Sequence, residues 1–574
     1  SGMNAGMLKE ARFGPKIRPL KEEVVGDVGK TLWVLLGTVS IVLVIACANV
    51  ANLFLVRAEG RHRELALRTA LGADRARVAK ELLGESVTLG ILGGLAGLAV
   101  AYAAIRLLLA LAPETVPRLE EITIDATVLA FTIALSLAAG IFFGLVPAFK
   151  YTRTNTASAL KEGGRGSSDG RERQRARGAL VVAQMALALV LLVGSGLMIR
   201  SFQALRQVDP GFVGPSEVLT FRISIPEAQI ADPSQVPLAH EQILRKIEAI
   251  PGVTSVGMSS SITMDGNHSS DPIFVEEFPV PGDQLPPIRR FKWIAPGYFE
   301  TMGNPVVAGR SMTWDDVRLR APIVIVTENF AREFWKSPEA ALGKRIRVTP
   351  RDKWREIVGV AGDVRDDGVD QKVTVVMYWP MSVRDFWEEI DFAQRNMAYV
   401  VRASRVGEAA FLQQIREAVW SLQPNVPIAS VQTLQEILDQ SMSRTSFTLV
   451  MLAIASGVAL LIGAVGLYGV ISYGVTQRTR EIGVRMALGA RRWDVSAMFL
   501  RHAALLSGVG IAIGLAAALV LTRLMSSLLF DVSPVDPLTY GVVSIVLAAV
   551  ALLSSYVPAR RASAVAPTEA LHWE

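Results

Sequence analysis

Seven apolar segments, each roughly 20 residues or longer, constrain this chain more than any other feature of its sequence. An apolar helix of roughly 20 residues is long enough to cross the hydrocarbon core of a bilayer. Of all residues, 51% are hydrophobic and 20% are charged, and the mean hydropathy is +0.36. The sequence therefore predicts a polytopic α-helical membrane protein in contact with a lipid bilayer. The segments lie at about 32–56, 84–111, 126–149, 178–199, 446–475, 503–526 and 538–557.

A long stretch between the fourth and fifth segments, residues 200–440, has the composition of a water-soluble domain. Runs rich in β-branched residues predict strands at 218–225 and 321–327. Apolar residues at helical spacing predict helices at 239–250 and 407–422. We therefore expect an α+β domain here, divided into two subdomains.

Loop charge predicts how the chain crosses the membrane, because loops rich in Lys and Arg stay in the cytoplasm. Seven, eight and six such residues lie in 57–80, 150–177 and 478–501, respectively. The loop 112–125 has one arginine, and 527–537 has no basic residue. The basic loops and the C-terminus are therefore predicted to be cytoplasmic, and the N-terminus and the 200–440 domain extracytoplasmic. The net charge of +6 follows this topology, so no nucleic-acid partner is expected.

One amphipathic phrase occurs twice, 417 residues apart. "RELALRTALGA" (63–73) and "REIGVRMALGA" (480–490) are identical at seven of eleven positions. The spans before and after each phrase, and the acidic loop that follows, recur in the same order. Because both copies have the same in–out sense, we read a parallel duplication about an axis along the membrane normal.

Small and polar residues inside the spans predict contacts between helices. The pairs Gly90/Gly94, Gly93/Gly97 and Gly510/Gly514 have the spacing that allows close helix packing. Asn49 and Asn52 are predicted to form hydrogen bonds between helices. In the second copy their positions hold Gly466 and Gly469, which argues against a site for a transported ion.

Several further motifs give the chain a family resemblance. They include "APGYFETMG" (295–303), "IVGVAGDVRD" (357–366) and "VPARRASAVAPTEAL" (557–571), besides the repeated phrase. With them the chain resembles the FtsX-like permeases of ABC transporters, a group that includes the membrane subunits of macrolide and lipoprotein exporters. Its duplication resembles the orphan permeases with two permease units in one chain. It departs from that pattern because the first span and first outside domain are absent, so both are expected to precede residue 1.

The resemblance implies a function. A permease of this family lies in the bacterial inner membrane and transmits the motion of a separate ATPase dimer to its extracytoplasmic domain. It implies export of a substrate, or its extraction from the outer side of the membrane. ATP would bind to the partner, and a periplasmic or outer-membrane protein is a further partner to consider.

The expected domains follow from the spans and the resemblance together. They are the tail of a first extracytoplasmic domain (1–30), a first permease unit (31–150), a basic cytoplasmic linker (151–177), a leading span (178–199), an extracytoplasmic α+β domain (200–440) and a second permease unit (441–574).

The repeated phrase is the candidate functional site. In each copy a glutamate precedes an arginine by four residues, the favourable order for an ion pair on a helix. Ile482, Met486 and Gly489 share one face, with Val484 and Leu488 nearby, and Gly72 and Gly489 suit a helix C-terminus. Taken alone, the pattern also fits an in-plane helix with its apolar face in lipid. The resemblance implies coupling helices that dock on the ATPase, formed by Arg63, Glu64, Arg68, Leu71 and Gly72 and by Arg480, Glu481, Arg485, Leu488 and Gly489.

Sequence motifs for catalysis are weak. "GDVGKT" (26–31) has Val24 where a phosphate-binding loop needs glycine, and the five histidines have no metal-binding spacing. We therefore expect no catalytic, cofactor or metal site on this chain. Two alternatives to the permease remain: a secondary transporter, and a signalling or scaffold protein whose outside domain binds a ligand.

Overall fold

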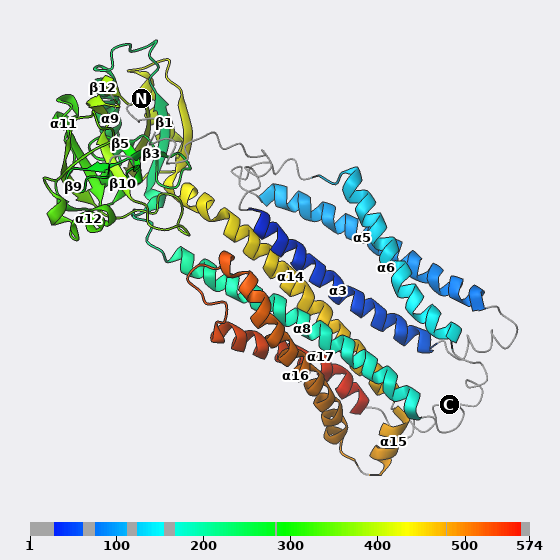
Figure 1. Cartoon of the computed structure of the whole chain (residues 1–574). Coiled ribbons are helices and arrows are strands. Elements are labelled where there is room, and N and C mark those ends of the chain that lie inside the picture. The colour runs from blue at the N-terminus through cyan, green and yellow to red at the C-terminus, as the bar shows by residue number, and fades with distance from the viewer. Residues whose placement is uncertain are drawn as a thin grey trace. The chain divides into compact units, whose positions relative to one another are not determined.

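The computed structural model describes residues 28–60, 75–111, 123–153, 167–281, 284–387, 389–477, 479–488 and 490–563. The chain forms two compact units, which we describe separately (Figure 1). We call Leu205–Ser446 the α/β unit. The described residues of Val25–Ala204 and Phe447–Glu574 form the helical unit.

The helical unit consists of long apolar helices. Within the described residues, six helices are long and apolar enough to cross a membrane, and a seventh contributes the shorter apolar stretch Ala126–Ile141. These features confirm the polytopic helical class. The helices are α3 (Val28–Gly60), α5 (Arg75–Leu111), α6 (Ala126–Arg153), α8 (Ser167–Arg206), α14 (Leu434–Gln477), α15 (Thr479–Ala487), α16 (Arg492–Leu524) and α17 (Pro537–Ser563).

The helices extend beyond the apolar segments that predicted them, and α8 and α14 also cross expected domain boundaries. Helix α8 begins inside the expected linker 151–177 and ends after residue 199. Helix α14 begins at Leu434, before the expected unit boundary at 441. Its start is capped, because the Thr433 N–H donates to Glu436 Oε2 (2.8 Å) and the Glu436 N–H donates to Thr433 Oγ1 (3.1 Å). Hydropathy marks the part of a helix that fits the bilayer, whereas the helix itself continues to its cap.

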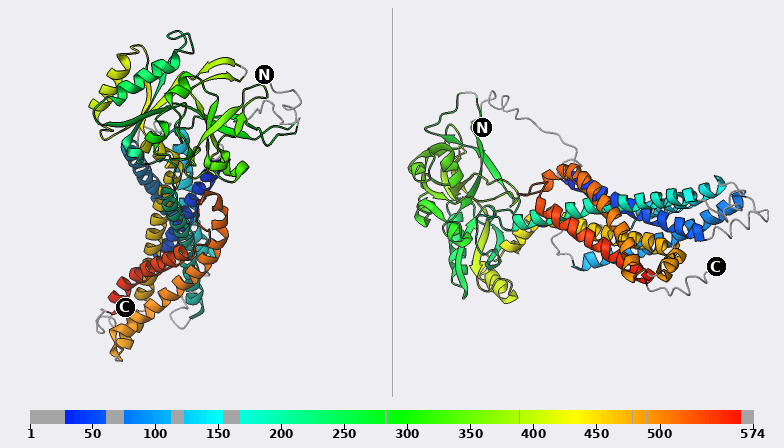
Figure 2. Two further views of the ribbon diagram at one scale, coloured as in Figure 1. Left: turned by 90° about the vertical axis from the view of Figure 1, so that its left-hand side faces the viewer. Right: turned by 90° about the horizontal axis from the view of Figure 1, so that it is seen from below.

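Helix α8 forms the core of the helical unit. Its residues Val181, Met185, Leu189, Val193 and Leu197 follow one another at four-residue spacing and are all buried. They pack with residues of α14, α16 and α17 in one cluster. In its apolar stretch, 67% of the residues are buried, against none in that of α5. Figure 2 shows α8 among these helices. One permease unit is therefore packed around α8.

The α/β unit contains a mixed sheet of twelve strands among the described residues. Its main path runs β14-β1-β13-β2-β5-β10-β7-β9-β8-β4, with β3 paired to β5 and β6 to β9. The strands are β1 (Val218–Ser224), β2 (Val253–Ser259), β3 (Ser269–Pro272), β4 (Phe274–Val275), β5 (Ile288–Ile294), β6 (Val306–Gly309), β7 (Ile323–Thr327), β8 (Arg345–Arg347), β9 (Arg355–Ala361), β10 (Val376–Pro380), β13 (Asn396–Ala403) and β14 (Ile428–Thr433). A separate hairpin joins β11 (Ser382–Phe386) and β12 (Glu389–Ala393).

Helices α9 (Val236–Glu248), α10 (Tyr298–Met302), α11 (Trp314–Arg318), α12 (Glu328–Trp335) and α13 (Ala409–Trp420) complete the α/β unit, with short 3-10 turns at Pro215–Glu217 and Glu339–Ala341. The strands predicted at 218–225 and 321–327, and the helices predicted at 239–250 and 407–422, are confirmed as β1, β7, α9 and α13.

The α/β unit has two hydrophobic cores, and the expected division into two subdomains stays a prediction. Along β7, Ile323 and Ile325 belong to one hydrophobic core, whereas Val324 and Val326 belong to another. Since successive side chains of a strand point to opposite faces, the two cores lie on the two faces of one shared sheet. The unit therefore has two cores but one continuous sheet.

Candidate functional site

Residues 480–487 of the second copy of the repeated phrase lie in the short helix α15, which comes between α14 and α16 in the chain. Ile482 is only 2% exposed, and Met486 packs beside it, one helical turn further along. Both contact the cluster that contains Phe499 of α16 and Ala559 of α17. The inner face of α15 is thus held by the ends of neighbouring helices.

A flank of α15 beside this buried face carries the predicted ion pair. Arg485 Nη2 lies 2.5 Å from Glu481 Oε1, with the side chains 53% and 47% exposed, respectively. Arg485 Nη1 also lies 3.6 Å from Met498 Sδ. An exposed pair of this kind stabilises a helix by less than about 1 kcal/mol. Its charges therefore contribute little to folding and are accessible to a partner.

Large apolar side chains flank this pair on the exposed surface of the helical unit. Leu488 is 82% exposed and Trp493 is 66% exposed, and Val484 is exposed as well. The turn between α15 and α16 is ordered by hydrogen bonds, from the Ala490 N–H to the Arg485 carbonyl (3.0 Å) and from the Arg491 N–H to Asp494 Oδ2 (3.1 Å). We call Glu481, Val484, Arg485, Leu488 and Trp493 the 481–493 surface.

The expected common face of Ile482 and Met486 is confirmed, and Gly489 lies outside the described residues. Ile482 and Met486 point into the protein, but Val484 and Leu488 do not accompany them. Trp493 was not among the predicted residues, although an exposed tryptophan beside a charged pair is typical of interface hot spots. In the first copy the corresponding residue is Ala76, so the two copies differ at this position.

Several predicted site residues belong to the first copy or to the end of the second. Arg63, Glu64, Arg68, Leu71, Gly72 and Gly489 lie outside the described residues. Arg480 belongs to α15, but its side chain also lies outside them. The candidate site is therefore built from the second copy.

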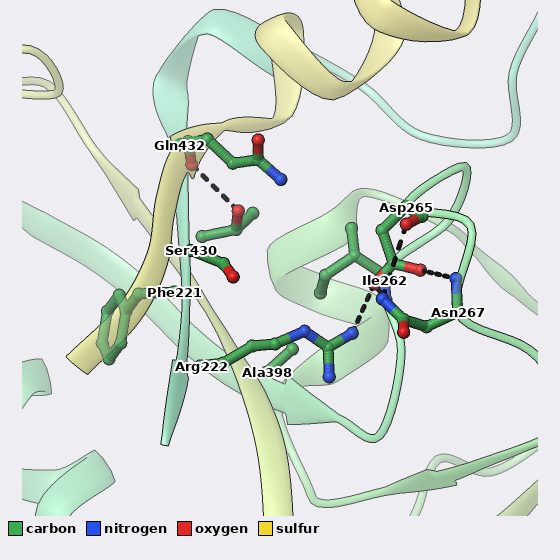
Figure 3. Close-up of a pocket in the computed structure, with 9 residues that line it drawn as sticks. Phe221, Arg222, Ile262, Asp265, Asn267, Ala398, Ser430 and Gln432 are labelled. Atoms are coloured by element: carbon green, nitrogen blue, oxygen red, sulfur yellow. Dashed lines mark hydrogen bonds and ion pairs between the residues drawn. The ribbon is translucent and has the colours of Figure 1, made fainter. Parts of the chain in front are cut away.

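A polar cavity in the α/β unit is the other site to consider. It lies where β1, β14 and the loop around Asp265 meet, and it has a volume of about 100 Å³. Arg222 Nη2 donates to Asp265 Oδ2 (2.6 Å), and the Asn267 N–H donates to Asp265 Oδ1 (2.8 Å), as Figure 3 shows. Pockets for drug-sized ligands have volumes of roughly 300–1,000 Å³. This cavity is large enough for a few water molecules and is smaller than that range.

Metal ligation has no support in the part of the chain that the structure describes. No group of three or more His, Cys, Asp or Glu side chains there is arranged to hold a metal ion.

Family models match most of the chain. The model of the FtsX-like permease C-terminal domain matches twice, at residues 37–156 and 453–567. The model of the MacB-like periplasmic core domain matches residues 176–418. The two FtsX-like matches cover the two permease units, and the second includes the 481–493 surface.

Individual relatives match a smaller part. The chain is similar to the "Macrolide export ATP-binding/permease protein MacB" of Hahella chejuensis, with 27% identity over 48% of this chain and 41% of that protein. The protein with the same description from Chromobacterium violaceum is 28% identical over 48% and 42%. The chain thus spans about two fifths of the length of these relatives. The crystal structure of the periplasmic region of MacB from Actinobacillus actinomycetemcomitans covers 42% of this chain and 98% of its own, at 15% identity and a TM-score of 0.26.

Proposed function

Because the chain belongs to the family of FtsX-like permeases that carry a MacB-like periplasmic core domain, we propose that it is the membrane subunit of an ABC-type transporter. A separate ATPase dimer binds and hydrolyses ATP, so this chain holds no cofactor. The protein lies in the bacterial inner membrane with its N-terminus and α/β unit outside and its C-terminus in the cytoplasm. Its action is the export of a substrate, or the extraction of one from the outer side of the membrane.

The observation that carries this proposal is the 481–493 surface. An in-plane anchor helix turns its apolar face towards lipid and its charges towards water. In α15 the apolar residues Ile482 and Met486 instead pack against the protein's own helices. Exposed outside this buried face is a mixture of one ion pair and large apolar side chains. Such a mixture suits a groove on another protein.

The descriptions of the relatives suggest which class of transport process to propose. Two of them are described as macrolide export proteins with ATP-binding and permease parts. We propose the same class of process here, with ATP binding on a separate subunit. A partner in the periplasm or the outer membrane would receive the exported substrate.

Charge reversal at the ion pair tests the proposal. We expect Glu481→Lys, Arg485→Glu and the double variant to insert normally but to lose binding of the ATPase and any stimulation of its hydrolysis. The double variant restores an attractive pair on the helix, yet presents exchanged charges to the partner. Co-purification of the ATPase with each variant is the measurement.

A matched control is Asp531→Lys, which makes the same change of charge at an exposed residue of the loop between α16 and α17. It should leave ATPase binding unchanged. Wild-type binding by the Glu481→Lys, Arg485→Glu double variant would reduce α15 to a membrane anchor with an internal ion pair. It would then favour a signalling or scaffold role.

A further inference from the structure

Two amide side chains are buried inside the helical unit, between helices of the two permease copies. Asn49 of α3 is 7% exposed, and Gln184 of α8 is 2% exposed. Asn49 Nδ2 donates to the carbonyl oxygen of Ile462 in α14 at 2.6 Å. Gln184 Nε2 lies 3.5 Å from the carbonyl oxygen of Ile45 in α3. The prediction of an interhelical hydrogen bond at Asn49 is confirmed, and the Asn52 side chain lies outside the described residues.

The contact joins equivalent positions of the duplication. Ile45 and Ile462 are 417 residues apart, the spacing of the repeated phrase, and so are Val42 and Ala459. All four side chains belong to one cluster with Ala188 and Leu191 of α8. One face of α3 therefore packs against the same face of α14. In each copy the isoleucine carbonyl lies beside an amide N–H, from Asn49 on one side and from Gln184 on the other.

Gly466, the counterpart of Asn49, makes room for this arrangement. A Cβ atom on Gly466 would lie 2.3 Å from Asn49 Oδ1 and 2.7 Å from Gln184 Oε1. Both distances are shorter than any normal contact between a carbon and an oxygen atom. A side chain at position 466 would therefore require the Asn49 and Gln184 amides to shift from these positions.

The amide oxygens give the cluster a further property. Asn49 Oδ1 and Gln184 Oε1 are buried and have no hydrogen-bond partner among the described residues. Separating α3 from α14 therefore breaks one good hydrogen bond, and separating α3 from α8 breaks one long one. Neither separation removes a hydrogen bond from the two amide oxygens. A hydrogen bond between membrane helices typically changes an equilibrium by a factor of about three, and at most by about twenty.

We propose that Asn49 and Gln184 form a polar latch between the two permease copies. The latch holds α3 against α14 in one register, and it is weak enough to open when the copies move apart. Asn49 is a positioning residue in this proposal. The latch is independent of the ATPase and of the proposed transport function.

Cysteine cross-linking in the full chain tests the register. In a Cys47→Ser background, one cysteine replaces Ala459 and a second replaces either Val42, which faces α14, or Val39, which is exposed. A protease site inserted after residue 160 separates the copies, so an oxidised pair keeps both fragments in one band. We expect the ratio of cross-linking rates, 42–459 over 39–459, to fall about threefold or more in Asn49→Leu. Ser40→Ala is the control, because Ser40 Oγ donates only within α3, to the Leu36 carbonyl (2.8 Å).

A swap of the two equivalent residues makes the test specific. Gly466→Asn alone should lower the ratio of cross-linking rates most, because the new side chain would clash with Asn49. In the double variant Asn49→Gly, Gly466→Asn, the amide comes from the other copy and can donate to the Ile45 carbonyl. We expect the ratio to recover to within about twofold of the wild type, well above that of Asn49→Gly.

The latch is refuted if Asn49→Leu keeps the wild-type ratio, or if the inserted swap variant stays as low as Asn49→Gly. Insertion is checked by labelling of a cysteine at residue 215 with an impermeant reagent. Should the swap variant fail to insert, the Asn49→Leu result decides. No ATPase enters this assay, so its outcome cannot be confused with a failure of the proposed function.

Discussion

The two permease copies contain the same glycine pair, yet the pair has different surroundings in each. Gly93 and Gly97 of α5 correspond to Gly510 and Gly514 of α16, at the same spacing of 417 residues. A Cβ atom on Gly514 would lie 2.9 Å from the Ala186 carbonyl oxygen in α8, and one on Gly510 would lie 2.7 Å from Met185 Cβ. At Gly93 and Gly97 no atom of the described residues lies within 4 Å of such a position. Close packing was predicted for both pairs. It is confirmed for the second pair, and for the first it stays a prediction, because no partner lies among the described residues.

The difference teaches that a repeated sequence specifies repeated helices but not repeated neighbours. Helix α8 lies against the glycine face of α16, and no described helix takes that place on α5. The prediction for Gly90 and Gly94 is confirmed, because they face Ser136 of α6 in their own copy.

Two aspartates that precede the last helix of each copy also have different neighbours. Asp125 accepts a hydrogen bond from the Val128 N–H and Asp536 one from the Thr539 N–H, both at 2.8 Å, and Asp536 also pairs with Arg200 of α8.

The largest expected effect is at the glycines. Gly514→Leu should destabilise the protein by about 3 kcal/mol, because the added atoms meet the backbone of α8. Gly97→Leu should leave the stability of the protein almost unchanged and serves as the matched control. Thermal unfolding in detergent measures both. An equal loss in the two variants would mean that Gly97 is as closely packed as Gly514 in the native protein.

Removal of the exposed tryptophan should have the next largest effect. Trp493→Ala is expected to weaken ATPase binding by about 2 kcal/mol, roughly thirtyfold, if Trp493 is the hot spot of the 481–493 surface. The first copy has Ala76 in place of Trp493, so we expect it to contribute less to ATPase binding than the second copy. Leu71→Ala should accordingly weaken ATPase binding less than Leu488→Ala does. Titration of the purified variants with the ATPase gives the dissociation constants. Equal losses at Leu71 and Leu488 would show that both copies dock alike.

The smallest effect concerns the two aspartates. Asparagine caps a helix about as well as aspartate, so Asp125→Asn should be nearly neutral. Asp536→Asn also removes the ion pair with Arg200, which at the surface stabilises the protein by at most about 1 kcal/mol. Thermal unfolding of the two variants in parallel measures the difference.

The pH dependence of this difference has a definite sign. The hydrogen bond from Arg200, together with those from Thr539, lowers the pKa of Asp536 to about 2. A lowered carboxyl pKa gives stability that is present above the ordinary value near 3.8 and disappears as the pH falls towards 2. The difference between wild type and Asp536→Asn should therefore be the same at pH 7 and pH 5. Its loss by pH 5 would contradict the ion pair.

Much of this architecture was predictable, because burial in a bilayer and alternation along strands depend on local composition. Long apolar segments predicted the membrane helices, and Glu481 and Arg485 formed the pair expected from their spacing. What lies next to a helix face was not predictable. Gly93 and Gly510 have the same local pattern, and only the presence of α8 distinguishes them. Trp493 was missed for the same reason, since its exposure depends on how α15 and α16 pack.

The asparagine–glycine contact between α3 and α14 has a consequence for how the two copies can evolve. In a homodimer with a two-fold axis, each residue near the axis meets its own copy, so one codon specifies both sides. Asparagine would then meet asparagine, or glycine would meet glycine. With both copies in one gene, one side can keep the donor while the other keeps the gap. Once this division exists, neither codon can change freely, and recombination that makes the two copies identical again would be selected against.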